Sequence, residues 1–180
     1  MDLWLSPHDF RVRSLKTLQV GFHCSRFGEC VALATDSHLL ALHFLEDRAE
    51  ATASLQAAWS QTRLLPSPRV GPLIEQALHA PKEVPVMAIG RPFQLTVWEF
   101  LRRTPLSVTL TYGEVALAIG HPKSARAVGR AVGSNPLAVV IPCHRVVSRG
   151  KLTGYRWGLE RKKSLLAWEL ANRDPLQMPF

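Results

Sequence analysis

The sequence predicts an α/β N-terminal domain over residues 1–88, with a small antiparallel sheet and helices. A mainly α-helical domain with a helix-turn-helix is predicted over residues 89–180. Three observations support this fold class. Apolar and polar residues alternate over residues 28–45, as they do in paired strands. A proline-rich segment separates the two halves of the chain. Two short helical patterns then flank a tight turn in the second half.

The N-terminal domain is expected to contain a strand pair followed by a helix. Residues 28–36 and 38–45 predict two strands that are joined by a turn at Asp36 and Ser37. The next segment, RAEATASLQAAWSQTRLL at residues 48–65, predicts an amphipathic helix.

The segment after this helix is rich in proline, which is typical of a connection between two folded units. Prolines stand at positions 66, 68, 72, 81, 85 and 92. One short helix is predicted inside the segment, over residues 72–80. We expect the domain boundary near residues 85–92.

The second domain is expected to begin with a helix in FQLTVWEFLRR that ends before Pro105. Phe93, Val97, Phe100 and Leu101 form one apolar stripe of this helix.

Two further helices predict the helix-turn-helix. In TYGEVALAIG, Thr111 is a favourable N-cap, Glu114 completes a capping box and Gly120 ends the helix. A second short helix follows in SARAVGRAVGSN, with Ser124 as its N-cap. The same geometry occurs in proteins that bind no DNA, so the pattern alone does not establish a function.

The basic residues gather in the second half of the chain. The net charge is +8; residues 1–90 hold 8 Lys and Arg against 9 Asp and Glu, and residues 91–180 hold 14 against 5. A concentrated basic region favours a polyanionic partner, nucleic acid first, although a generally basic protein would show the same excess. Lys123, Arg126 and Arg130 fall on the helix-turn-helix and favour nucleic acid.

The second helix of this motif is lined with small residues, and if it approaches a nucleic-acid groove, Arg126 is the only long side chain expected to point into that groove. Glycine inside a helix costs about 1 kcal/mol relative to alanine, so a compensating contact is expected. The contact is either close packing against a neighbouring helix or close approach to a nucleic-acid groove. The small residues are Ala125, Ala127, Gly129, Ala131 and Gly133.

The remaining composition predicts a cytoplasmic protein, associated with the nucleoid if the source is bacterial. No apolar run approaches the roughly 20 residues of a membrane helix, and the N-terminus lacks the pattern of a signal peptide. Three cysteines indicate a reducing compartment. Cys24 and Cys30, with His23, form at most a partial metal site, so we expect no metal and no cofactor.

The stretch PLAVVIPCHRVVSRG, residues 136–150, places a thiol beside two groups that can carry positive charge. A thiolate is a far better nucleophile than a thiol, and nearby positive charge or a base lowers the pKa of a cysteine. Cys143 is therefore a candidate nucleophile and His144 a candidate base, acting through a turn or a water. A structural cysteine beside a histidine is the alternative.

The motif IPCHRV resembles the active-site signature of the O6-alkylguanine-DNA alkyltransferases. The match continues in order through FQ..VW..L, TYGEVA..IG.P.SARAVG, NP, IPCHRVV and G.LTGY..GL.RK..LL..E, and covers residues 93–169 almost without a gap. The N-terminal half is similar more loosely. The resemblance implies a ribonuclease-H-like N-terminal domain and a monomer that binds duplex DNA through the minor groove.

The resemblance also implies a role for individual residues. Cys143 corresponds to the alkyl acceptor, His144 to the base that reaches the thiol through a water, and Glu169 to the carboxylate that orients the histidine. Asn135 corresponds to the residue that braces the turn, and Tyr112 to the residue that assists the leaving guanine. Arg126 replaces the flipped base in the stack. The implied DNA-facing set is Thr111, Lys123, Ala125, Arg126, Ala127, Gly129, Arg130 and Ala131.

The implied function is a single, irreversible transfer of an alkyl group from O6-alkylguanine, or O4-alkylthymine, in duplex DNA to Cys143. A non-catalytic reader of alkylated DNA, a thiol hydrolase and a transcription factor are the alternatives. Two departures from the family pattern stand out: Ser107 and Val108 replace a glycine and a basic residue, and Arg156 and Trp157 replace small residues. The second departure falls in the expected substrate pocket, which comprises Tyr112, Val146, Tyr155, Arg156 and Trp157.

Overall fold

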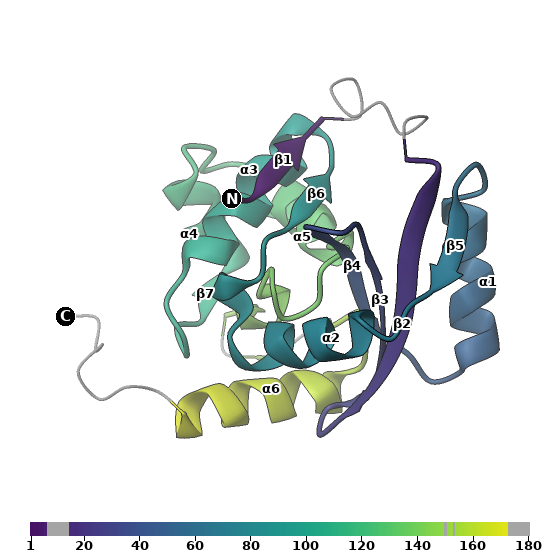
Figure 1. The fold of residues 1–180 in the computed structure, drawn as a ribbon. Helices are drawn as coiled ribbons and strands as arrows, with labels where there is room; N and C mark the ends of the chain where they lie inside the picture. The colour runs from purple at the N-terminus through teal and green to yellow at the C-terminus, as the bar shows by residue number, and fades with distance from the viewer. Residues whose placement is uncertain (7–14, 150, 153, 173–180) are drawn as a thin grey trace.

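The computed structural model describes residues 1–6, 15–149, 151–152 and 154–172 (Figure 1). Its N-terminal half is built around a four-stranded sheet with the strand order β4-β3-β2-β5. The strands are β2 (Thr17–Ser25), β3 (Gly28–Ala34), β4 (Leu39–Phe44) and β5 (Arg63–Pro66).

The sheet is mixed, because β5 runs parallel to β2 whereas β2, β3 and β4 pair antiparallel. The prediction of an antiparallel sheet is therefore correct only for the three consecutive strands. Helix α1 (Arg48–Ala58) carries the chain back along the sheet between β4 and β5. A crossover of this kind brings the next strand in parallel, whereas a tight turn reverses it.

The predicted strand pair is confirmed as β3 and β4. Strand β2 was missed, although Leu18, Val20 and Phe22 alternate with other residues along it and could have indicated it. The helix predicted over 48–65 is wrong beyond Ala58, since residues 63–66 pair with β2 instead. Pairing satisfies the backbone of that edge, which outweighs the weak preference of a short segment for helix.

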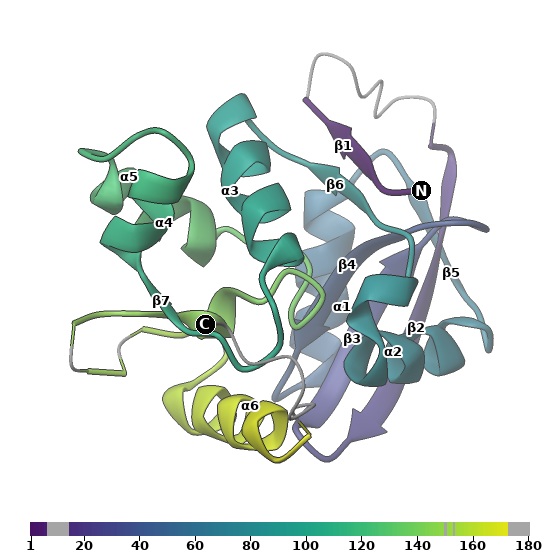
Figure 2. The same ribbon diagram turned by 90° about the vertical axis from the view of Figure 1, so that its left-hand side faces the viewer.

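Helices α1 and α2 (Val70–His79) cover opposite faces of the sheet (Figure 2). Alternate residues of β3 point to the two faces, as the period of a strand requires. Val31 and Leu33 join the apolar cluster that contains Leu55 of α1, whereas Ala32 and Ala34 join the cluster that contains α2. The short helix predicted over 72–80 is confirmed as α2, which begins two residues earlier.

The C-terminal half is mainly helical, as predicted. The capping box is confirmed: Thr111 Oγ1 accepts a hydrogen bond from the Glu114 amide at 3.2 Å, and the Glu114 carboxylate accepts one from the Thr111 amide at 2.6 Å. Ser124 takes the N-cap position of the next helix, but its side chain makes no capping hydrogen bond. The helices are α3 (Pro92–Arg103), α4 (Tyr112–Ala118), α5 (Ala125–Gly133) and α6 (Leu159–Ala171).

Helices α4 and α5 form the helix-turn-helix and lie on the opposite side of the molecule from the sheet (Figure 2). Helix α6 runs below α2 (Figure 1) and contains Lys162 and Glu169 of the last motif segment. A parallel pair, β7 (Leu110–Thr111) and β8 (Val146–Val147), joins the start of α4 to the segment after Cys143.

One apolar core connects the two halves. Its buried residues come from both sides of the predicted boundary at residue 88, which stays a prediction. Strand β1 (Leu3–Leu5) pairs in parallel with β6 (Met87–Ile89) beside α3. Leu42 of β4 also bridges to Leu137, in the turn that precedes Cys143. Single-turn helices lie at η2 (Pro81–Glu83) and η3 (Cys143–Arg145).

Candidate active site and nucleic-acid interface

The turn before Cys143 is built around one amide side chain. Asn135 is fully buried, and its Nδ2 donates hydrogen bonds to Leu137 O at 3.2 Å and Ile141 O at 2.8 Å. Its Oδ1 accepts from the Leu137 amide at 2.9 Å. Nδ2 also lies 3.0 Å from Cys143 Sγ. Asn135 therefore holds the turn together through its side-chain hydrogen bonds and supplies a donor to the sulfur.

The same turn contains strained backbone. Val139 has φ of +66°, a region that β-branched residues rarely adopt. Strain of this kind costs about 1–3 kcal/mol and persists only where the surrounding structure holds it, often at functional sites. The strain is local to the loop that ends at Cys143.

Cys143 lies at the start of η3 with only 4% of its surface exposed. Burial raises its pKa to about 11, although the Asn135 amide and the Lys162 charge lower it in part. The thiol is therefore protonated at neutral pH and needs a base before it can attack as a thiolate.

His144 is fully buried, and its Nε2 lies 2.7 Å from Glu169 Oε1. Burial lowers the pKa of His144, while the Glu169 carboxylate raises it in part. A neutral imidazole beside an ionised carboxylate carries its proton on Nε2, which leaves the lone pair on Nδ1. His144 Nδ1 is buried and has no partner among the described residues.

Glu169 of α6 accepts hydrogen bonds from two more residues. Arg145 Nε lies 3.0 Å from Oε1 and 2.9 Å from Oε2, and its Nη2 lies 2.8 Å from Oε1. The Ser107 amide lies 3.2 Å from Oε2. Burial would raise the pKa of Glu169, but the bonds from His144 and Arg145 dominate and lower it to about 2. The carboxylate is therefore ionised and fixed toward the imidazole.

Arg145 and Ser107 are residues whose contacts the sequence analysis missed. Arg145 Nη1 also donates to Thr104 O at 3.0 Å and Pro105 O at 3.1 Å. Ser107 has φ of +63°, and its hydroxyl donates to Glu169 O at 2.8 Å. The glycine expected at position 107 by resemblance was the available signal, since positive φ favours glycine.

Lys162 of α6 is also buried, and its Nζ donates to Val146 O at 2.6 Å. Burial lowers its pKa, whereas the nearby Cys143 raises it in part. Its position in the RK motif gave no sign of burial, because lysine is among the residues most often exposed.

The predicted pocket residues lie around this site in different environments. Tyr155 packs near His144, with ring centroids 6.4 Å apart, and its buried hydroxyl lacks a partner among the described residues. Trp157 is 9% exposed, and its ring packs 5.3 Å from Tyr155 and 6.2 Å from Phe44 of β4. The indole thus joins the core between the two halves. Arg156 is exposed with its guanidinium over the indole, and Val146 is buried.

Tyr112 is the first residue of α4 and is partly buried. Its ring lies against α5, because a Cβ built at Gly129 would sit 3.8 Å from the Tyr112 ring. Gly129 therefore serves packing between the two helices of the motif. Gly129 also keeps part of its surface exposed.

Most of the predicted DNA-facing residues are accessible. Lys123, Arg126 and Arg130 are exposed, and none forms an ion pair within the described part of the chain. Ala131 is a correction: it is 1% exposed and packs in the core, and its carbonyl accepts from Trp98 Nε1 at 2.7 Å. The periodicity of α5 turns this position toward α3. Thr111, Ala125 and Ala127 are partly exposed.

The described residues contain no group of three or more His, Cys, Asp or Glu side chains that could hold a metal ion. Cys24, Cys30 and Cys143 are free thiols. Across the described ranges, no helix has the length and apolar character needed to cross a membrane.

The fold and the site together define a class of protein that combines a helix-turn-helix of the DNA-binding type with a candidate nucleophilic cysteine. A helix-turn-helix with free basic side chains lies in the same unit as a buried cysteine, and that cysteine is flanked by an amide donor and a histidine–carboxylate pair.

The comparisons with known proteins agree with this class. Residues 92–171 match the family model of the 6-O-methylguanine DNA methyltransferase DNA-binding domain. The methylated-DNA–protein-cysteine methyltransferase of Mycolicibacterium paratuberculosis is 56% identical over 81 residues, which cover 44% of this chain and 49% of the relative. The Kluyveromyces lactis enzyme of the same name is 49% identical over 84 residues, covering 46% and 44%. The chain thus spans about half the length of these curated relatives.

A solved structure matches over nearly its whole length. Mycobacterium tuberculosis OGT, crystallised in complex with DNA, is 35% identical, with a TM-score of 0.70. The match covers 86% of this chain and 93% of that one. The predicted fold class is thereby confirmed. The chain belongs to the methylated-DNA–protein-cysteine methyltransferase family.

Proposed function

We propose that this chain repairs DNA by moving an alkyl group from O6 of guanine to Sγ of Cys143, once per molecule. The observation that carries the proposal is the set of contacts around Cys143: the Asn135 amide on the sulfur, and His144 held by an ionised Glu169. O4-alkylthymine is a second proposed substrate, since it presents the same alkyl–oxygen bond.

The chemistry follows from these contacts. Sulfur attacks the alkyl carbon in line; the S–C bond forms as the C–O6 bond breaks. The thiol proton passes to His144 Nδ1 through a bridging water, and Glu169 stabilises the resulting imidazolium. The departing purine takes up one proton and leaves as guanine. The thioether product is not hydrolysed by water, so the transfer is stoichiometric.

The damaged base has to leave the duplex to reach the buried thiol. We propose that α5 enters the minor groove, with Arg126 filling the space of the flipped base and Lys123 and Arg130 contacting phosphates. Tyr112, next to α5, donates to the leaving guanine. In this proposal the protein acts as a monomer and needs no cofactor or metal. It works in the compartment that holds the DNA, and a reducing cytoplasm would keep its nucleophilic cysteine in the free thiol form.

The mass of the intact protein tests this function. After incubation with duplex DNA that contains O6-methylguanine, we expect the gain of one methyl group per molecule, on Cys143. A thiol hydrolase would turn over without a stable gain, and a non-catalytic reader would bind without any. If the protein gained the methyl group but showed no detectable binding to the duplex, the proposed role of the helix-turn-helix would be contradicted.

Cys143→Ser is the matched control. This variant should transfer nothing, because serine lacks the nucleophilic sulfur, yet it should bind the same DNA with an affinity near that of the unchanged protein. A gel-shift assay measures this. Binding lost in a folded variant would mean that the thiol itself is needed for the complex.

A further inference from the structure

We propose that Arg102 is a positioning residue for the alkyl transfer: it ties the turn that carries Cys143 to Asp2 beside the N-terminal strand β1. The inference rests on the proposed function and extends it, because it gives the N-terminal part of the chain a role in the reaction. Arg102 touches neither the thiol nor His144 in the described contacts, so it acts only through the turn.

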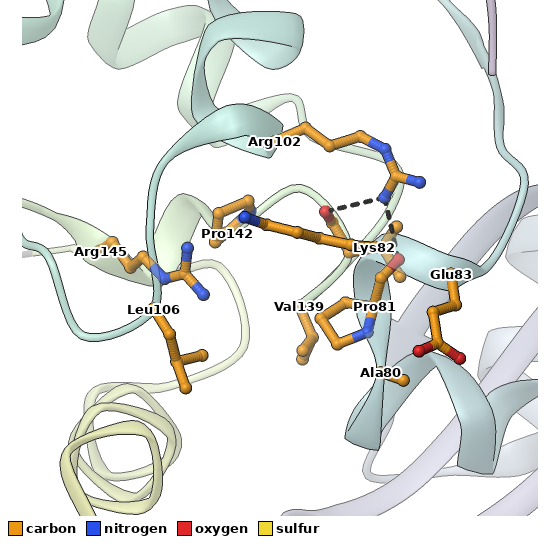
Figure 3. A pocket seen from close by; sticks show the side chains of 10 residues that line it. Ala80, Pro81, Lys82, Glu83, Arg102, Leu106, Val139, Pro142 and Arg145 are labelled. Carbon is orange, nitrogen blue, oxygen red and sulfur yellow. Dashed lines mark hydrogen bonds between the residues drawn. The ribbon is translucent and has the colours of Figure 1, made fainter. Parts of the chain in front are cut away.

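Arg102 lies near the end of α3 and is 7% exposed. Its Nε lies 2.5 Å from Asp2 Oδ2, and its Nη2 lies 3.1 Å from Asp2 Oδ1. The other N–H groups reach three segments: Nη2 donates to Val84 O at 2.8 Å, and Nη1 donates to Pro81 O at 3.1 Å and Val140 O at 3.4 Å. The last two contacts are drawn in Figure 3.

Asp2 is tied in turn to the connection between the halves. Its Oδ1 accepts from the Val86 amide at 3.2 Å, and the next residue, Leu3, donates to Val86 O at 2.7 Å. One guanidinium therefore joins the start of the chain, the connection at residues 81–86 and the acceptor turn. The planar fork of arginine suits this arrangement, since its five donors point in fixed directions.

The acceptor turn needs such support. Val139, beside the residue that Arg102 contacts, holds positive φ, and strained backbone stays in place only when its neighbours hold it. On one side, β4 does so: the Leu42 amide donates to Pro136 O at 2.9 Å, and the Ala138 amide donates to Leu42 O at 2.8 Å.

On the other side the turn faces a cavity. A space of about 290 Å³ is lined by Val139, Val140 and Pro142 from the turn, and by Pro81 and Lys82 from the connection (Figure 3). Close packing fixes a loop by contact, and a cavity removes that contact. Arg102 reaches across this side and bonds the turn directly.

This arrangement predicts a kinetic effect. Cys143 follows the turn directly, so a loosened turn moves the sulfur relative to the alkyl carbon. Misplacement of a reacting group by about 1 Å can cost up to roughly 10²-fold in rate. The N-terminal residues then influence the rate without contact with the substrate.

The test compares three single variants and one double variant. Asp2→Asn keeps the shape of the side chain but removes its charge, and Arg102→Gln removes the guanidinium. Arg103→Gln is the matched control, because Arg103 is the next residue of α3 and, among the residues that the structure describes, pairs only with Glu99 at the exposed surface. Single-turnover methyl transfer is measured with saturating O6-methylguanine duplex, at a temperature well below unfolding of every variant.

We expect Asp2→Asn and Arg102→Gln to slow transfer by about tenfold or more, with DNA affinity within about twofold and the control unchanged. The double variant should be no slower than the slower single variant, since both break one link. Lower melting temperatures with unchanged transfer rates, or effects that multiply in the double variant, would overturn the inference.

Hydrogen exchange of the free protein gives an independent readout. The amides of Val140, Ile141 and Cys143 should exchange faster in Asp2→Asn, whereas those of β3 should not. If the unchanged protein fails to transfer methyl groups, the proposed function fails, and this exchange pattern alone decides whether Arg102 holds the turn. Equal exchange in both proteins would overturn the link.

Discussion

Arginine occupies two opposite environments in this molecule. Inside, Arg145 is 4% exposed, and its guanidinium binds Glu169 and two backbone carbonyls. On the helix-turn-helix, Arg126 and Arg130 are exposed and form no ion pair with the described residues. The guanidinium of Arg145 is paired with groups of the protein itself, whereas those of Arg126 and Arg130 are accessible to a partner.

Arginine therefore has two different roles in this molecule, one in the interior and one on the surface. Buried, paired charges hold groups in fixed positions, and their removal leaves a partner charge uncompensated. Exposed, unpaired charges contribute little to folding but can attract and contact a polyanion. The interior is therefore expected to respond to substitution through stability and chemistry, and the helix-turn-helix through binding.

The largest expected effect is on stability and comes from Arg145→Met. Loss of the guanidinium leaves the buried Glu169 carboxylate without its main counter-charge, which costs about 3–5 kcal/mol of unfolding free energy. Urea unfolding measures the loss. The control Arg103→Met, on the exposed face of α3, should change stability by about 0.5 kcal/mol or less. A loss of similar size in both variants would contradict the contrast.

The same interior site should govern acid stability. Glu169 has its pKa lowered from 4.5 to about 2, so the unfolded chain binds a proton before the folded protein does. This group's contribution, about 3 kcal/mol, is present above pH 4.5 and is lost as the pH falls toward 2. In Glu169→Gln, the slope of unfolding free energy against pH should be smaller in this range. An unchanged slope would assign the acid sensitivity elsewhere.

The transfer rate should also depend on Glu169. A neutral amide supports a protonated His144 less well, so Glu169→Gln should slow transfer by about 10²-fold or more, the usual contribution of general-base catalysis. The rate should require higher pH, because the Cys143 thiol becomes harder to deprotonate. A rate profile against pH with unchanged midpoint would mean that Glu169 serves only the packing of Arg145.

On the helix-turn-helix, Arg126→Ala should have a smaller and more selective effect. An inserted side chain offsets part of the few kcal/mol that base flipping costs. We expect repair of O6-methylguanine in duplex DNA to slow by about tenfold, whereas reaction with the free base stays near its starting rate. Equal slowing on both substrates would exclude the role in flipping.

The smallest expected effect comes from single phosphate contacts. Lys123→Gln or Arg130→Gln should weaken DNA binding a few-fold and reduce the slope of log affinity against log salt by about 1. Unfolding free energy should change by about 0.5 kcal/mol or less, because both side chains are exposed. Binding titrations at several salt concentrations measure the slope; an unchanged slope would show that the residue makes no phosphate contact.

The helix-turn-helix and its capping box could be predicted from the sequence because their signals are local. Thr111 and Glu114 are three residues apart and bond within one helical turn. Two of the failed predictions depend on non-local contacts. Residues 63–66 became a strand because β2 offered an edge 46 residues earlier in the chain, and Ala131 is buried because α3 packs against it.

The sequence by itself determined most of the local elements and, through the PCHR motif and its ordered neighbours, the candidate nucleophile Cys143 and the candidate base His144. Only the tertiary structure decided their electrostatics. Cys143 and Arg145 are two residues apart, but Glu169 comes from α6, and Arg102 reaches Asp2 across 100 residues of chain. Burial and pairing set a pKa or fix a guanidinium, and both depend on which distant segments the folded core brings together.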